Sequence, residues 1–167
     1  ARSVGGEARP TWLAPLFLGD YSQYKAQFGI SDDDVIKVSY ISASDVRSAQ
    51  MRADMQYARQ IAKELQQSVN NYATEQSRSG AIDSATKSAI MEVTQAQSSA
   101  EITGHEKRTE FYQIVDEEDA LTGKVSRKCI MYQVYVIPQT TWARTTATYL
   151  KKVLGEMPEE LSMDEKA

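Results

Sequence analysis

The chain has a single cysteine, Cys129, and a single histidine, His105, the two side chains best suited to nucleophilic chemistry. A cysteine nucleophile needs a nearby base, and an imidazole is a common one. The two residues fall on either side of a predicted hairpin loop, so a Cys129–His105 pair would have to form across that hairpin. The apolar neighbours of Cys129 instead favour a small buried side chain with a protonated thiol. One cysteine also excludes an intramolecular disulfide.

Metal chemistry finds no better support in the residue spacing. The dipeptide His105-Glu106 resembles the start of a zinc-protease helix, but Thr109 stands where that motif requires its second histidine. The acidic runs 32–34 and 116–119 lack the alternating ligands and terminal glutamate of an EF-hand calcium loop. The glycines are scattered, and none forms a phosphate-binding loop. We therefore expect no catalytic residue, no metal, no cofactor and no enzymatic activity.

The composition is that of a globular protein of ordinary hydrophobicity. The 167 residues are 41% hydrophobic and 25% charged, which suits one domain, and the formal net charge is −4. The five acidic residues and one basic residue of 156–167 account for that whole excess, so the rest of the chain is formally neutral. The chain has no excess of basic residues of the kind that indicates nucleic-acid binding. No segment approaches the roughly 20 apolar residues of a membrane-spanning helix. We therefore expect neither nucleic-acid binding nor a membrane span.

Periodicity predicts a strand followed by a long helix. Residues 35–42 are rich in β-branched side chains, with Ile36, Val38 and Tyr40 on one face of the strand. In the helix that follows, apolar residues separated by four and three positions predict a buried stripe. The stripe consists of Met51, Met55, Ala58, Ala62, Leu65, Val69 and Tyr72, and Val46, Ala53, Tyr57 and Ile61 flank it.

A second helix, two strands and a last helix complete the predicted order. The second helix starts near Asp83 or Ser84, beyond a break at Gly80, and either forms a hairpin with the first helix or continues it. The last strand carries apolar residues on both faces, which predicts that it is central or covered on both sides. The elements after the second helix are a strand over 102–115, a loop over 116–124, a strand over 129–137 and a helix over 142–154.

The order β-α-α-β-β-α predicts an α+β fold, in which one long helix and shorter helices pack on one face of a small antiparallel sheet. We divide the chain into an irregular aromatic-containing arm over 1–30, a single α+β domain over 31–155 and an acidic flexible tail over 156–167. The aromatic residues of the arm either cover an edge of the core or form an interaction surface. They are Trp12, Phe17, Tyr21, Tyr24 and Phe28.

Three stretches resemble the family of bacterial outer-membrane lipoproteins named for a twenty-kilodalton member, whose module also forms the N-terminal domain of flagellar assembly protein T. They are Pro10-Thr-Trp-Leu13, the alanine- and arginine-rich helix (Ala49, Ala53, Ala58-Arg59, Ile61-Ala62, Leu65 and Val69), and the strand Met131-Tyr-Gln-Val-Tyr-Val-Ile137 with the helix after it. The resemblance extends over roughly residues 10–155. It implies a periplasm-facing outer-membrane protein, held by an N-terminal lipid that this chain, starting at Ala1, lacks. It assigns no catalytic residue.

Two functions fit these observations and the resemblance. The first is a non-enzymatic structural or protein-interaction module of the cell envelope, whose partner is an envelope protein or a cell-wall component bound by the arm or by the open face of the sheet. The alternative is a carrier of a small ligand or lipid, with a pocket between the long helix and the sheet. A homo-oligomer joined through the helical stripe and an enzyme with an unfamiliar carboxylate site are two further alternatives.

Overall fold

The computed structural model describes residues 2–6 and 9–157 of the chain. Contacts between Cα atoms divide the chain into two compact units, whose bounds differ from those predicted at residues 30 and 155. One helix, α3 (Val46–Ser79), is continuous through both units. The first unit consists of Ala1–Tyr57 and Gly104–Thr141, and the second consists of Ala58–Thr103 and Trp142–Ala167.

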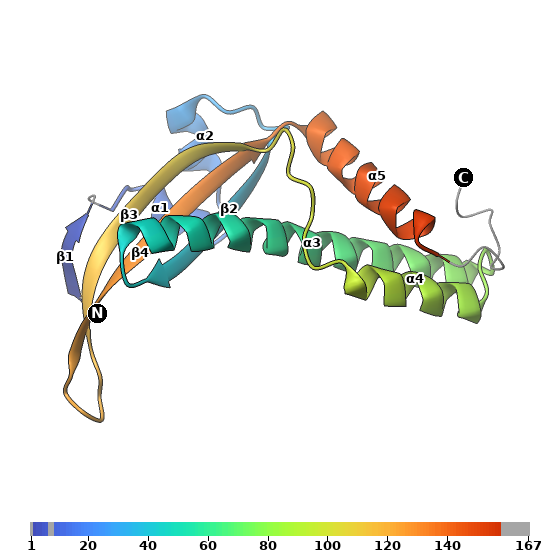
Figure 1. The fold of residues 1–167 in the computed structure, drawn as a ribbon. Helices are drawn as coiled ribbons and strands as arrows, with labels where there is room; N and C mark the ends of the chain where they lie inside the picture. Colours follow the sequence, from blue (N-terminus) through green and yellow to red (C-terminus); the bar gives the residue numbers. More distant parts are fainter. Residues whose placement is uncertain (1, 7–8, 158–167) are drawn as a thin grey trace. The chain divides into compact units, whose positions relative to one another are not determined.

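The first unit is built on a four-stranded antiparallel sheet (Figure 1). Its strands are β1 (Arg2–Gly6), β2 (Val35–Ala43), β3 (Glu106–Glu118) and β4 (Val125–Ile137). β4 is central, with β3 on one side and β2 on the other, and β1 extends the sheet beyond β3. The predicted α+β fold with a small antiparallel sheet is confirmed, as is the central place of the strand with two apolar faces. The sequence does not predict β1, because its two glycines give it little intrinsic strand preference and pairing with β3 supplies its order.

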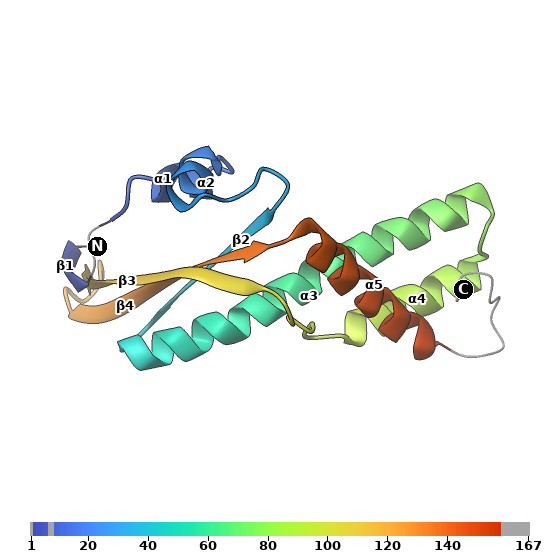
Figure 2. The same cartoon turned by 90° about the horizontal axis from the view of Figure 1, so that it is seen from above.

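Helices cover both faces of this sheet, which corrects the prediction that they pack on one face. The short helices α1 (Leu13–Phe17) and α2 (Ser22–Phe28) lie on one face, and the beginning of α3 lies on the other (Figure 2). Tyr132, Val134 and Val136 of β4 belong to the cluster under α1 and α2. The intervening residues of β4 point to α3, so each apolar face of the strand has its own cover.

The predicted irregular arm over 1–30 is corrected, because this segment contains β1, α1 and α2. Pro15 fits into the first turn of α1, where its missing N–H removes no intrahelical hydrogen bond. Gly29 ends α2 with a left-handed backbone conformation, at a φ of 64°. Proline and glycine therefore mark the limits of short helices in this segment and do not keep it irregular.

The predicted apolar stripe of α3 is confirmed in the second unit, where Ala62, Leu65 and Val69 are buried, but it is wrong in the first unit. In the first unit, Ala49, Ala53 and Tyr57, each four residues from the next, are fully buried against the sheet. Met51 and Met55, which the stripe predicts to be buried, are 60% and 54% exposed. The small side chains of Ala49 and Ala53 allow close approach of the helix to the strands, and this contact selects the buried face.

The second unit contains the rest of α3, together with α4 (Ser84–Ala96) and most of α5 (Gln139–Gly155). The predicted break is confirmed, since α3 ends before Gly80, which has a φ of 83°. The predicted cap at Asp83 is also confirmed, because the backbone N–H of Thr86 donates to Asp83 Oδ1 at 2.7 Å.

Side-chain contacts hold the end of the second unit where the sequence predicts the start of a flexible tail. Gln97 Nε2 donates to Glu156 Oε2 at 2.6 Å, and Met157 is buried. The tail prediction is therefore corrected for residues 156 and 157, and its remainder, 158–167, lies outside the described residues.

Candidate functional site

The five aromatic residues predicted as an interaction surface divide into core and surface residues. Trp12 and Tyr24 are buried. The Trp12 ring meets Tyr24, Phe28 and Phe111 edge-to-face, at centroid distances of 4.9, 5.9 and 5.7 Å. A buried ring has no surface to offer to a partner, so Trp12 and Tyr24 are corrected from interaction residues to core residues.

A hydrogen bond fixes this aromatic core to the sheet. The Tyr24 hydroxyl lies 2.6 Å from Thr109 Oγ1 of β3, and desolvation by burial raises the pKa of Tyr24. Tyr21 and Phe28 pack against the same cluster and are half-buried. Of the predicted set, Phe17 is thus the residue that leaves a large apolar ring exposed.

Phe17, at the end of α1, is 46% exposed and lies edge-to-face against two rings of the sheet. Its ring centroid is 5.4 Å from that of Tyr40 on β2 and 5.9 Å from that of Tyr132 on β4. Tyr40 is 55% exposed, and Leu18, which follows Phe17, is 87% exposed. Tyr132 is buried beneath these side chains and belongs to the core. We call the exposed residues Phe17, Leu18 and Tyr40 the aromatic surface.

A hollow of about 260 Å³ adjoins the aromatic surface. Leu13 and Ala14 of α1 line it together with Phe17, Tyr40 and Tyr132. Arg9 adds a guanidinium group to this lining, and its Nη2 donates to Gln113 Oε1 at 3.4 Å. The hollow therefore combines aromatic and aliphatic walls with a hydrogen-bond donor, a composition suited to binding an apolar segment with accessible carbonyl groups.

The opposite face of the sheet carries a hydrogen-bonded cluster centred on Gln133, which is fully buried. Gln133 Nε2 donates to Asp54 Oδ1 of α3 at 2.6 Å and to Glu110 Oε2 of β3 at 2.9 Å. The Tyr135 hydroxyl donates to Gln133 Oε1 at 3.1 Å. Lys107 Nζ lies 3.0 Å from Asp54 Oδ1 and 3.1 Å from Glu110 Oε2. We call these five residues the polar network.

The protonation states of the polar network do not suit catalysis. Desolvation lowers the pKa of Lys107, but its hydrogen bonds to Asp54 and Glu110 outweigh this effect and raise the pKa. The amine therefore stays protonated and is not a nucleophile. Burial raises the pKa of Tyr135 to about 12. Because the charged groups satisfy one another through Gln133, the network serves to join α3 to the sheet.

The structure does not bring Cys129 and His105 together. In the β3–β4 register, Cys129 lies opposite Ile114, whereas Glu106, the neighbour of His105, lies opposite Val136. Positions 129 and 136 are roughly 23 Å apart along β4, at about 3.3 Å per residue. Cys129 is buried as predicted, and burial raises the pKa of its thiol. The nucleophile–base pair across the hairpin is therefore excluded.

His105 precedes β3 and is half-buried beside α3. Its Nδ1 lies 2.8 Å from the Tyr57 hydroxyl, and the Tyr57 ring stacks on Tyr135 with centroids 3.5 Å apart. Desolvation lowers the pKa of His105 below its ordinary value of 6.5, so the imidazole is neutral at pH 7. Among residues 2–6 and 9–157, no group of three or more His, Cys, Asp or Glu side chains is placed to hold a metal ion.

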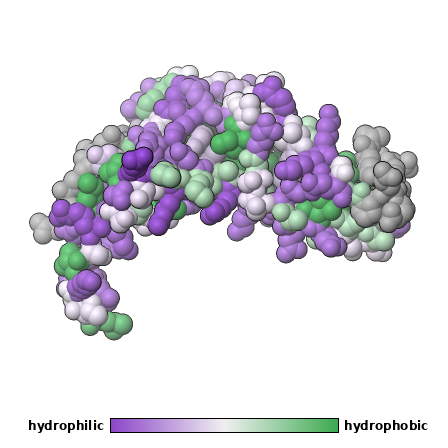
Figure 3. Space-filling model, in the orientation of Figure 1, coloured by the Kyte–Doolittle hydropathy of each residue, from purple (hydrophilic) through white to green (hydrophobic). Residues whose placement is uncertain are grey.

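Apolar side chains are also exposed at the tip of the β3–β4 hairpin (Figure 3). Leu121 is 95% exposed there, and Val125 is exposed as well. The turn is ordered by the backbone N–H of Leu121, which donates to Asp119 Oδ1 at 2.8 Å. Isolated exposed leucines are common on protein surfaces, so Leu121 serves as a reference for the aromatic surface, where several rings gather.

Sequence reasoning misses Leu18, Tyr40 and the polar network as features of the surface and of the helix–sheet contact. Alternation along β2 places Tyr40 on the same face as Val38. It does not show that α1 stops short of covering Tyr40. For the polar network, one signal is present, since Gln133 interrupts an otherwise apolar strand face. Its partners come from sequence positions too distant to be read from a pattern.

Comparison of the chain with protein-family models, with curated proteins and with solved structures found no match. In the part of the chain that the structure describes, no helix is long and apolar enough to cross a membrane. The resemblance to the outer-membrane lipoprotein family therefore stays a prediction that rests on the residues that carry it.

Proposed function

We propose that the protein is a non-enzymatic interaction module whose partner docks on the aromatic surface. The observation that supports this proposal is the hollow lined by the exposed rings of Phe17 and Tyr40, beside the exposed Leu18 that follows Phe17 in the chain. Contiguous apolar exposure on an otherwise polar surface is typical of interaction sites. Aromatic residues are also the side chains most enriched in the energetically dominant parts of protein interfaces.

The partner that fits the hollow best is an extended, proline-containing apolar segment of another protein. The volume of about 260 Å³ lies below the range of roughly 300–1,000 Å³ typical of small-molecule sites, so it suits one or two side chains. Proline-rich segments dock on aromatic-lined grooves because they are already extended before binding. The Arg9 guanidinium lines the same hollow and can donate to a peptide carbonyl.

The alternative carrier function finds less support, because the contact between the beginning of α3 and the sheet is filled. Ala49 and Ala53 are fully buried there, and the Tyr57 and Tyr135 rings stack at 3.5 Å. An envelope location with a lipid anchor, and an envelope protein as the partner, remain part of the proposal on the strength of the resemblance.

The test is binding of a library of proline-containing decapeptides, followed by NMR of the tyrosine and phenylalanine rings. We expect a bound peptide to shift the Phe17, Tyr40 and Tyr132 resonances. The double variant Phe17→Ala/Tyr40→Ala should weaken binding at least about tenfold, and the matched variant Leu121→Ala should leave it unchanged.

Two results would overturn this proposal. One is a library in which every peptide that binds perturbs residues away from the aromatic surface. The other is a lipid mass retained in native mass spectrometry of protein purified without detergent, since that result favours the carrier function. Thermal melts of both variants check that the loss of binding does not come from unfolding.

A further inference from the structure

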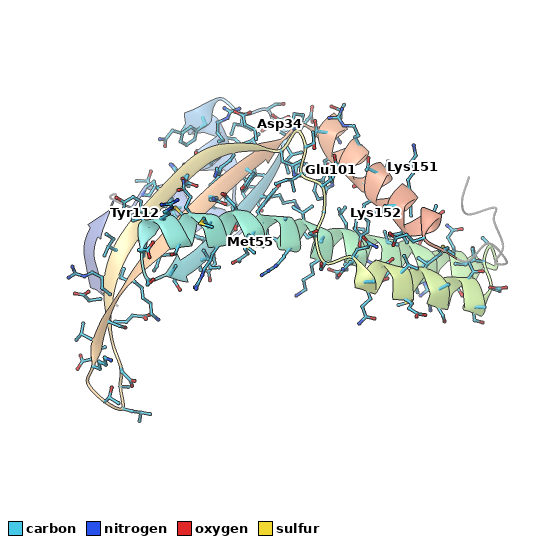
Figure 4. All side chains as sticks on the ribbon, in the orientation of Figure 1. Asp34, Met55, Glu101, Tyr112, Lys151 and Lys152 are labelled. Carbon is cyan, nitrogen blue, oxygen red and sulfur yellow. The ribbon has the colours of Figure 1, made fainter. Side chains whose placement is uncertain are left out.

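The outward side of α3 in the first unit carries exposed methionines. Ala49, Ala53 and Tyr57 face the sheet and are fully buried. At about 100° per residue, Met51 and Met55 lie on the side of the helix turned away from those three residues. Both methionines are more than half exposed, and Figure 4 labels Met55 on α3.

Two arginines of the first unit lie close to these methionines on the helix. At the same rotation per residue, Arg47 and Arg52 lie within about 100° of Met51 around the helix axis. Both arginines are exposed, and neither forms an ion pair with another residue in the described part of the chain. We call Met51, Met55, Arg47 and Arg52 the methionine–arginine surface.

We propose that the methionine–arginine surface docks an acidic amphipathic helix of another protein. Such a helix would place apolar side chains on Met51 and Met55 and carboxylates beside the arginines. Methionine is unbranched and polarizable, so it adapts to the side chains of a second helix. Opposite charges on the two surfaces would raise the association rate and select the partner.

The charges argue against a second copy of the chain as the occupant. A two-fold interface brings the same surface of both copies together, so Arg47 and Arg52 would face an identical pair of cations. The nearest carboxylate on this part of α3, that of Asp54, is already bound by Lys107 and Gln133. Like charges placed across an interface are unfavourable, and a partner rich in glutamate and aspartate removes this conflict.

This inference goes beyond the proposed function and does not depend on it, because the two surfaces use different residues on different elements. A helix docked on this surface would also explain why apolar residues recur at helical spacing on the exposed side of α3. The spacing of four and three that joins Met51, Met55 and Ala58 is that of a helix-packing stripe, and in the first unit the fold leaves the two methionines of this stripe uncovered.

The test uses a synthetic helical peptide with leucines at the same four-three spacing and glutamates on both sides, and a matched peptide with lysines in place of the glutamates. We expect the acidic peptide to bind and its affinity to fall as salt is added. The variants Met51→Ser/Met55→Ser and Arg47→Glu/Arg52→Glu should each weaken it at least about tenfold. Arg78→Glu, at the far end of α3, and Phe17→Ala/Tyr40→Ala should leave the affinity unchanged.

Four results would overturn the inference. The lysine peptide would bind as tightly as the acidic one, or light scattering would show a dimer that the methionine variant abolishes. Anionic phosphatidylglycerol vesicles would compete away the peptide at lower concentrations than neutral vesicles, which would assign the surface to lipid. Finally, the acidic peptide would bind only after residues 158–167 were removed, which would assign the surface to the acidic end of the chain itself.

Discussion

In the first unit, helices cover both faces of the sheet, but the buried side chains are apolar on one face and polar on the other. Under α1 and α2, Trp12 is enclosed by aromatic rings and the contact is apolar. Under α3, Gln133 is just as deeply buried, but it is enclosed by charged and hydroxyl groups that it joins by hydrogen bonds. Alternate residues of one strand, β4, contribute to both faces.

This difference shows which residues are available for function. On the aromatic face, the residues that α1 and α2 cover form a core, and the rings beyond the end of α1 form the aromatic surface. On the α3 face, Lys107 and Gln133 both bind the carboxylates of Asp54 and Glu110, so these groups are engaged with one another. The two proposed binding surfaces therefore lie outside these contacts, one on the exposed rings beyond α1 and the other on the side of α3 turned away from the sheet.

Of the variants that test this difference between the two faces, Trp12→Ala should cause the largest loss in the free energy of unfolding. Removing a buried aromatic side chain from a packed core costs about 3–5 kcal/mol, which is enough to unfold a domain of ordinary stability. Urea unfolding followed by circular dichroism measures the loss. Phe17→Ala is the matched control, and we expect about 1 kcal/mol or less because the ring is nearly half exposed. Equal losses for the two variants would mean that the aromatic surface is core as well.

The polar face is tested by Gln133→Leu, which keeps the approximate size of the side chain and removes its hydrogen bonds. Asp54 and Glu110 lose a donor, and the buried Tyr135 hydroxyl loses its acceptor. We expect a loss of about 1–3 kcal/mol in the free energy of unfolding. Gln50→Leu is the control, since Gln50 also donates to Glu110 but is exposed. A Gln133→Leu protein as stable as the wild type would contradict a structural role for the network.

The charges of the same network should contribute less than its buried amide. Lys107→Met removes the cation between Asp54 and Glu110, which are both partly exposed. We expect a loss of about 0.5–1 kcal/mol, and the loss should shrink in 1 M salt because screening weakens the repulsion between the two carboxylates. Lys124→Met, in the hairpin loop, serves as the control with no expected effect. A loss that does not change with salt would show that packing of the lysine stem, and not its charge, is responsible.

The smallest expected effect is the pH dependence that comes from His105. Because its pKa in the folded protein is lowered from 6.5, the unfolded chain takes up a proton first as the pH falls. The free energy of unfolding should therefore decrease below pH 6.5 and stop decreasing once the folded protein also binds the proton. NMR titration of the single imidazole gives the folded pKa directly, and His105→Gln should flatten the stability curve between pH 7.5 and 5.5. A midpoint at or above 6.5 would contradict the burial of the ring against Tyr57.

The sequence predicts those parts of the fold that depend on local chemistry. The alternation in β4 predicts a strand with two apolar faces, and the Asp83 cap and the break at Gly80 follow from side-chain and backbone preferences alone. The stripe of α3 is confirmed at Ala62, Leu65 and Val69 but wrong at Met51 and Met55. The residue spacing shows which positions share a side of the helix and not which side meets the sheet. The small size of Ala49 and Ala53, decisive for that contact, is not visible as hydrophobicity.

The candidate site is predicted only in part, for a similar reason. Trp12, Phe17 and Tyr24 look alike in the sequence as aromatic residues of one segment. Whether each lies in the core or at the surface depends on where α1 and α2 end on the sheet, which strands from distant parts of the chain decide. Tyr40 joins the aromatic surface by the same long-range packing, through the contact of its ring with Phe17.

The division of the chain into two units also has a consequence for its synthesis. Each unit is assembled from two separate segments, and the first unit takes its two longest strands from the second of these. A ribosome that has released α3 has therefore made β2 and the helix, but not β3 and β4. Ala49, Ala53 and Tyr57 therefore stay partly uncovered until β4 emerges. Such non-local pairing slows folding and leaves apolar surface exposed in the meantime. Newly made chains should depend on chaperones until residue 141 has left the ribosome.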